Sequence, residues 1–301
     1  MTPEEQEKIN KLPLNNLFLA AVEKSPFDAL CTILRVDGMS DPGWDPLEES
    51  QATIEHYAAL AKAETTSKRR KMRLGVLIYC HITEMGASYE VVSNLLRILQ
   101  GKSYQLDPFQ DLEKEFKDGT RIPPSLSQKL KRIRKQAEGI GSPEIYAAFD
   151  TVVVRDLRNA FYHSDYSITE NEFRLTRGFG KSIPWDDVKQ IIEKGLDHYA
   201  RFTAMHKSAL ASLRTAPQFH KVGDWRVLEL LRSADGELYG FSVHFSNDSK
   251  ATFARTTKGI IAENLVLQDN DVDLYYGDLD ALRDEFRVNG APFKEDTPPP
   301  S

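Results

Sequence analysis

The chain has 301 residues, of which 41% are hydrophobic and 28% charged, and its formal net charge is −6. This is the composition of a globular protein with a substantial core, and no apolar run approaches the roughly 18 residues that cross a bilayer. The two cysteines, Cys31 and Cys80, lack CxxC spacing, which excludes a disulfide scaffold and a thiolate zinc finger. The polar, acidic N-terminal segment has no secretory pattern, so we expect a cytoplasmic protein without membrane attachment.

The first part of the chain has the periodicity of helices. Apolar residues recur three and four positions apart, which predicts helices over residues 15–23, 46–64, 69–83, 88–99 and 124–138. Residues 37–43 are rich in turn-forming types and predict a loop. Gly101 stands where a glycine commonly ends a helix.

A further helix is predicted to begin at Ser142 and to run to about His163. Ser142 is suited to cap it, Pro143 to occupy its first turn, and Glu144 to face its positive end. A short polar connection follows and is expected to pair as a hairpin around residues 176–181. The last long helix is predicted over residues 184–213.

Beyond Thr215 the period changes to that of strands. Apolar residues alternate with small or polar ones from Tyr239 to Phe245, which predicts a half-buried strand. Asp235-Gly236 joins it as a hairpin to a strand over residues 227–231. Two more strands are expected over 251–255 and 272–276, a closing helix over 279–286, and a frayed tail around the prolines 298–300.

These elements predict a mainly α protein, with a helical domain over residues 1–214 and a small α+β domain over residues 222–290, followed by a disordered tail over 291–301. The charge supports this division. Residues 215–301 hold 9 Lys and Arg against 15 Asp and Glu, so the whole net charge of −6 lies there.

Two basic runs without acids lie in the helical part, at residues 65–83 and 120–137. Clusters of Lys and Arg bind polyanions by releasing counterions. The second run supplies four candidate RNA-binding residues, namely Lys129, Arg132, Arg134 and Lys135. The alternative is that both runs form solvated helix faces.

The most informative segment covers residues 155–166 and has the sequence RDLRNAFYHSDY. Four residues separate Arg158 from His163, and a polar Asn159 follows the arginine. This pattern resembles the R-x4-H signature of the HEPN superfamily, whose members are helical bundles that often act as metal-independent endoribonucleases in toxins and anti-phage defence. A second match, at residues 201–206, lacks the polar residue and lies mid-helix, so we interpret it as accidental.

The resemblance implies a set of roles. Arg158 holds the phosphate, Asn159 orients it and His163 transfers a proton, with Arg155, Asp156 and Tyr166 in support. Histidine titrates near neutrality, and the arginine fork binds phosphate. Some family members carry a tyrosine two residues after the histidine, where this chain has Asp165.

The RNA 2′-hydroxyl is the nucleophile of such nucleases, so the resemblance implies an RNA substrate and neither cofactor nor metal. HEPN nucleases pair two copies of the motif, which implies a homodimer with a composite active site. A toxin-like nuclease also implies an antitoxin or a regulatory partner.

Helix geometry constrains these roles. At about 100° per residue, Asp156, Asn159 and His163 share one face of a helix, whereas Arg158 lies about 140° from His163. The helix must therefore end or distort before His163, or the arginine must act across the dimer.

Other interpretations stay open. The bundle can instead be a non-catalytic HEPN-like module that dimerises and binds a protein or nucleic-acid partner, or an unrelated helical fold. Cys80, His81 and Glu84 offer too few ligands at metal spacing, and we favour core packing for Cys80 and His81. His198 and His206 are expected to be surface or packing residues.

Overall fold

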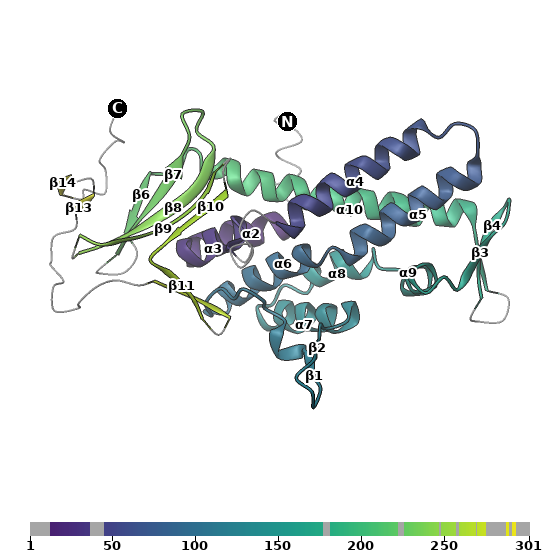
Figure 1. Ribbon diagram of the computed structural model, residues 1–301, viewed down its shortest axis with the longest axis horizontal. Helices are drawn as coiled ribbons and strands as arrows, with labels where there is room; N and C mark the ends of the chain where they lie inside the picture. Colours follow the sequence, from purple (N-terminus) through teal and green to yellow (C-terminus); the bar gives the residue numbers. More distant parts are fainter. Residues whose placement is uncertain are drawn as a thin grey trace. The chain divides into compact units, whose positions relative to one another are not determined.

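The computed structural model describes residues 13–36, 45–176, 181–221, 226–246, 248–256, 259–268, 270–274, 287–288 and 291–292. It is mainly helical, with an antiparallel sheet in the C-terminal part, as predicted (Figure 1). The chain divides into two compact units. One comprises Met1–Trp44, Glu90–Pro124 and Met205–Ser301, and the other comprises Asp45–Tyr89 and Ser125–Ala204.

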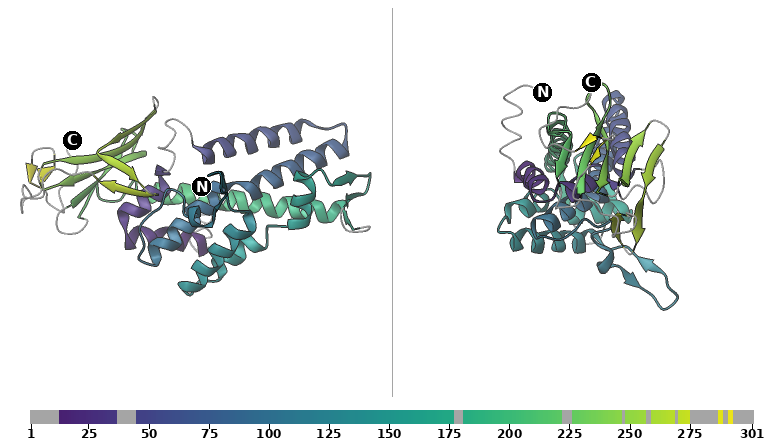
Figure 2. Two further views of the ribbon diagram at one scale, coloured as in Figure 1. Left: turned by 60° about the horizontal axis from the view of Figure 1, so that its bottom comes forward. Right: turned by 90° about the vertical axis from the view of Figure 1, so that its left-hand side faces the viewer.

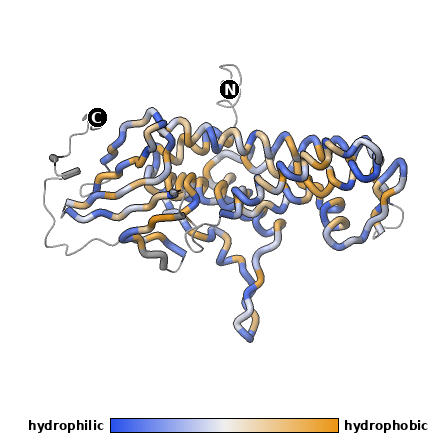
Figure 3. The backbone as a smooth tube through the Cα atoms, turned by 45° about the horizontal axis from the view of Figure 1, so that its top comes forward, coloured by the Kyte–Doolittle hydropathy of each residue, from blue (hydrophilic) through white to orange (hydrophobic). Residues whose placement is uncertain are grey.

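The second unit is a helical bundle with a small sheet. Its helices are α4 (Pro46–Ala63), α5 (Lys68–Glu84), α7 (Leu126–Gly139), α8 (Glu144–Asp150), α9 (Arg155–Tyr162) and the first part of α10 (Trp185–Ser212). Polar caps fix where the helices begin: the Asp45 side chain accepts a hydrogen bond from the Leu47 amide, and Ser125 forms a capping box with Gln128. Figure 3 shows hydrophobic and hydrophilic residues alternating along the helices, which is the pattern that predicted them.

The single helix predicted over residues 142–163 is wrong, because the chain leaves the helix at residues 151–154. Pro143, rather than Ser142, precedes α8, and no side chain caps it. The break falls on consecutive valines at 152–154, whose β-branched side chains disfavour helix. The Tyr79 hydroxyl donates a hydrogen bond to the Val152 carbonyl (2.9 Å) and accepts one from the Val154 amide (2.7 Å). These bonds replace helical ones that the break removes.

Tyr79 reaches the break because glycine makes room for its ring. A Cβ atom on Gly195 of α10 would lie 2.8 Å from Cδ2 of Tyr79, and one on Gly75 of α5 would lie 2.9 Å from Ile192. Tyr79 is fully buried, and burial raises the pKa of its hydroxyl to about 12. Cys80 lies in the same core cluster, which confirms its expected packing role.

A three-stranded antiparallel sheet follows α9, in the order β3 (Tyr166–Ile168), β4 (Glu172–Leu175), β5 (Ser182–Pro184). The predicted hairpin is confirmed, since β4 and β5 pair and the Leu175 amide donates to the Lys181 carbonyl at 3.0 Å. Residues 177–180 of its turn lie outside the described residues. Strand β3 was not predicted because its three residues are too few for alternation to be recognised.

The first unit contains α2 (Pro13–Lys24), α3 (Pro26–Ile33), the part of α6 (Gly86–Leu99) from Glu90 onward, the end of α10, and the 3-10 turn η2 (Gln110–Leu112). Its main sheet is drawn in green in Figure 2. The sheet has five antiparallel strands, which pair in the order β10 (Gly259–Glu263), β9 (Lys250–Thr256), β8 (Leu238–Phe245), β7 (Arg226–Arg232), β6 (Phe219–Lys221). Three hairpins pair β1 (Lys114–Glu115) with β2 (Arg121–Ile122), β11 (Leu265–Gln268) with β12 (Asp271–Leu274), and β13 (Arg287–Val288) with β14 (Ala291–Pro292).

Most local predictions in this unit are confirmed. Gly101 ends α6 with a φ of +75°, and strands cover the ranges expected at 227–231, 239–245 and 251–255. Strand β12 covers the described part of 272–276. The predicted loop at 37–43, helix at 279–286 and tail lie outside the described residues. The change from helix to strand falls between Ser212 and Phe219, near the predicted boundary, while the proposed domain limits stay predictions.

Strand β8 differs from the prediction because both of its faces are buried. Its polar positions are satisfied by pairing rather than by water: Ser242 and Thr252 share a hydrogen bond of 2.9 Å, and His244 Nε2 lies 2.7 Å from Glu229 Oε2. Gln218 also donates to Glu229, at 3.1 Å. Buried polar groups of a sheet must be paired in this way.

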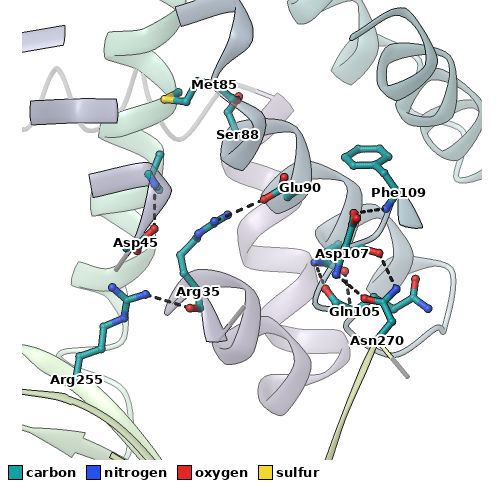
Figure 4. A network of polar contacts seen from close by, with 12 residues as sticks. Arg35, Asp45, Met85, Ser88, Glu90, Gln105, Asp107, Phe109, Arg255 and Asn270 are labelled. Carbon is teal, nitrogen blue, oxygen red and sulfur yellow. Dashed lines mark hydrogen bonds and ion pairs between the residues drawn. The ribbon is translucent and has the colours of Figure 1, made fainter. Parts of the chain in front are cut away.

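Helices and loops of the first unit are joined to its strands by polar contacts (Figure 4). Arg255 of β9 donates to the Arg35 carbonyl at 3.0 Å, and the Arg35 guanidinium lies 3.6 Å from Glu90 of α6. The Asn270 side chain accepts from the Asp107 amide and donates to its carbonyl, at 2.5 and 2.7 Å. In the described part of the chain, no helix has the length and apolar character required to cross a bilayer.

The variant Tyr79→Phe is expected to lower the free energy of unfolding by about 1–3 kcal/mol, because it leaves the Val152 carbonyl and the Val154 amide without their partner. Urea unfolding measures this loss. Tyr239→Phe is the control, since the Tyr239 hydroxyl has no hydrogen-bond partner among the described residues. Equal stability of the two variants would contradict the role given to Tyr79.

The Glu229–His244 pair predicts a pH-dependent stability. Burial is the largest influence and acts to raise the pKa of Glu229, but the hydrogen bonds from His244 and Gln218 and the nearby charges of His244 and Lys250 together outweigh it, and the net pKa lies below the ordinary value. A carboxyl with a lowered pKa stabilises the fold above the unfolded-state pKa, and this contribution disappears as the pH falls through the folded-state pKa. The stability difference between wild type and Glu229→Gln should therefore be largest at pH 7 and shrink below about pH 4.

Urea unfolding at several pH values measures this difference. Glu193→Gln serves as the control, because Glu193 is an exposed carboxylate on α10 whose removal should matter little at any pH. A Glu229→Gln difference that stays constant with pH would contradict the pairing.

Candidate functional site

His163 occupies the C-terminal cap of α9, where the chain turns from the helix into β3. The Asp165 amide donates to the Ala160 carbonyl (2.9 Å), and the Ser164 amide donates to the Phe161 carbonyl (3.2 Å). These two bonds form a Schellman closure, with Ser164 in the left-handed region at a φ of +55°. The helix thus ends at Tyr162, directly before the histidine.

A pocket of about 360 Å³ opens beside this helix end. Its lining residues are Asp156, Asn159, Ala160, His163, Asp165, Leu175 and Lys181. The geometric prediction that Asp156, Asn159 and His163 share a face is therefore confirmed. All three side chains are exposed, and the Lys181 ammonium lies 3.6 Å from an Asp156 carboxylate oxygen.

Arg158 lies outside the set of residues that line the pocket, on another side of α9. Its Nε donates to the Glu84 carboxylate, and its guanidinium lies 5.8 Å from the centre of the Tyr162 ring. Its Nη1 donates to the Asn159 side-chain oxygen at 2.9 Å. Among the described residues that line the pocket, Asn159 is the one to which Arg158 is hydrogen-bonded, and the break at residues 151–154 does not add the arginine to the lining beside His163.

The supporting residues take different positions. Asp156 lines the pocket, whereas Arg155 is exposed in the first turn of α9 and is not among the lining residues. The Tyr166 ring stacks between Phe161 and Phe173, with centroid distances of 5.5 and 4.8 Å. Tyr166 thus packs the small sheet against α9.

The candidate RNA-binding residues of α7 do not line the pocket. Arg134 is paired with Glu138 at 2.8 Å, a hydrogen bond that raises the pKa of its guanidinium, and it also lies over the Tyr146 ring at 5.6 Å. Lys135 is exposed, and Lys129 and Arg132 are half-buried. An RNA contact by this helix stays a prediction.

Three residues of the site had no role in the sequence-based prediction of catalysis. Lys181 and Asp165 line the pocket, and Glu84 holds Arg158. Lys181 lies in the connection between β4 and β5. Its place in the pocket could have been predicted only if the pairing register of that hairpin had been known.

His198 and His206 have packing roles, which is one of the two positions expected for them. Burial, with the Phe149 ring 5.0 Å away, lowers the pKa of His198 to about 4. His206 Nε2 lies 2.8 Å from the Ile33 carbonyl oxygen. Over the part of the chain that the structure describes, no three His, Cys, Asp or Glu side chains gather as metal ligands would.

Compared with family models, with curated proteins and with solved structures, the chain matches none of them significantly. The site must therefore be interpreted from its own geometry.

A double-mutant cycle measures the interaction energy between Glu84 and Arg158. We expect the pair Glu84→Gln and Arg158→Met to show a coupling of about 0.5–1 kcal/mol in urea unfolding, because both side chains are only partly exposed, at 35% and 23%. The i,i+4 pair Asp197–Arg201, with both side chains more than half exposed, provides the comparison and should couple by about 0.3 kcal/mol. No coupling between Glu84 and Arg158 would contradict the contact.

Proposed function

We propose that the protein is a metal-independent endoribonuclease of the HEPN type, in which His163 transfers the proton. The observation that supports this proposal is the pocket that gathers Asp156, Asn159 and His163 at the end of α9. An exposed imidazole beside a carboxylate and an amide is a chemical set suited to proton transfer at a bound substrate.

In this reaction a base takes the proton of an RNA 2′-hydroxyl, whose oxygen attacks the adjacent phosphorus. The bond from phosphorus to the 5′-oxygen breaks, the leaving oxygen takes a proton from an acid, and a 2′,3′-cyclic phosphate forms. One protomer supplies one such histidine. We therefore propose a homodimer in which His163 of each chain serves one of the two proton transfers.

Asn159 and Arg158 enter the proposal in linked roles. Arg158 donates to the Asn159 side-chain oxygen, and the amide nitrogen of Asn159, which has no hydrogen-bond partner among the described residues, can donate to a phosphate oxygen or to a ribose hydroxyl. Arg158 then acts as a positioning residue. The sequence-based role, direct contact with the phosphate, requires the arginine to leave Glu84.

The contact of Arg158 with Glu84 favours a second candidate function, in which the protein is a non-catalytic binding module. An arginine bound by Glu84 and stacked on Tyr162 is a stable feature of the fold, which a binding protein could retain without catalysis. We propose a role in defence or stress response only for the nuclease, whose activity an antitoxin or regulatory partner would inhibit.

Cleavage of labelled single-stranded RNA and tRNA in EDTA tests the proposed function. Wild type is expected to produce 2′,3′-cyclic phosphate ends, and His163→Ala should lower the rate by about 100-fold or more, the contribution typical of a proton-transfer group. His206→Ala is the matched control and should cleave at the wild-type rate, because His206 is hydrogen-bonded to the Ile33 carbonyl and is not among the residues that line the pocket.

Two outcomes would contradict the nuclease. Equal cleavage by wild type and His163→Ala would assign the activity to another site. Absence of cleavage in every variant, with a stable dimer in solution, would instead support the binding module.

A further inference from the structure

We propose that Lys181, rather than Arg158, supplies the positive charge that binds an RNA phosphate in the pocket beside His163. The catalytic meaning of this inference rests on the proposed function, but phosphate binding itself can be measured separately.

The charges of the pocket show why a cation is needed there. Among the lining residues that the structure describes, Asp156 and Asp165 carry negative charge, and His163 is positive only when protonated. A phosphodiester would be repelled by the exposed Asp156 carboxylate unless a permanent cation offset its charge. Lys181 is the one residue of this described lining whose side chain carries a permanent positive charge.

Lys181 is also free to change partners. Its ammonium lies 3.6 Å from Asp156, but both side chains are about two-thirds exposed. Ion pairs in such a position stabilise a protein by less than about 1 kcal/mol. A phosphate can therefore replace Asp156 as the partner of the ammonium at little cost to the fold.

Arg158 is in the opposite situation. Its side chain is only 23% exposed and contacts the Glu84 carboxylate, the Asn159 amide oxygen and the Tyr162 ring. Turning it toward the pocket would break these contacts together and leave Glu84 without its cation. A phosphate that enters the pocket therefore binds the loosely paired Lys181 more readily than Arg158.

The proposal predicts the direction in which Asp156→Asn changes the affinity for phosphate. Asp156→Asn removes the competing partner of Lys181 and one negative charge from the pocket, so it should tighten phosphate binding. A site in which Asp156 itself bound the ligand would show the reverse.

The experiment measures binding of a fluorescent 2′-O-methylated tetranucleotide, which lacks the nucleophilic hydroxyl and cannot be cleaved. We expect Lys181→Met to weaken binding by about tenfold or more, the scale of a lost charge-assisted contact. Lys181→Arg should stay within about threefold of wild type, because the charge is retained. Arg158→Met should weaken binding clearly less than Lys181→Met does, because Arg158 acts on the ligand only by holding Asn159. Asp156→Asn should bind more tightly.

Lys189→Met is the matched control, since Lys189 is an equally exposed lysine with a partner carboxylate on α10. It should bind as wild type does. The dependence of binding on salt gives a readout that a merely structural role would not change: Lys181→Met should lower its slope by about 0.7, the value for one phosphate contact on a single strand. Competition by inorganic phosphate distinguishes recognition of the phosphate from recognition of a base.

The inference is overturned if wild type does not bind the tetranucleotide, if Lys181→Met binds as wild type does, or if Arg158→Met loses as much affinity as Lys181→Met. Cleavage assays on the same variants separate the two proposals. Cleavage that does not depend on Lys181 would overturn the inference and leave the nuclease. Lys181-dependent binding without any cleavage would overturn the nuclease and leave the inference.

Discussion

The hydroxyl of Tyr79 holds the chain where it leaves the helix between α8 and α9, by bonding to the Val152 carbonyl and the Val154 amide. Gly195 gives the ring the space it needs. Because α9 starts as a new helix after this break, the break sets the direction of its side chains, which no longer continue the rotation of α8. The orientation of Asp156, Asn159 and His163 toward one pocket therefore depends on a buried phenol from α5.

The charged groups around α9 are sorted onto two sides with different properties. On one side Arg158 is half-buried, paired with Glu84 and stacked on Tyr162, and such a group contributes to the position of the helix. On the other side the pocket holds the exposed Asp156 carboxylate, the exposed His163 and a loosely paired Lys181. Exposed and weakly paired groups are the ones that can exchange a partner for a ligand, so the chemistry that we propose lies on that side.

The sequence predicted most helices and several strands closely, because apolar spacing and polar caps are local signals. It did not predict the break at residues 151–154 or the burial of both faces of β8, since each depends on partners that are distant in the sequence. Tyr79 binds the chain at the break, and the Phe27 ring of α3 packs on Phe241 of β8. The same distinction holds for the site. Rotation along one helix placed three residues on a common face, whereas Lys181 and Glu84 come from other elements and have no local signature.

The most direct measurement of the central claim is an NMR titration of the histidine side chains with the uncleavable 2′-O-methylated tetranucleotide, with the His163 signal assigned by comparison with His163→Ala. If the pocket beside α9 is the RNA site, the His163 ring resonances should shift on binding, while those of His198 and His206, which are packed against other rings and backbone, should stay in place. An unchanged His163 signal at saturating ligand would contradict the claim.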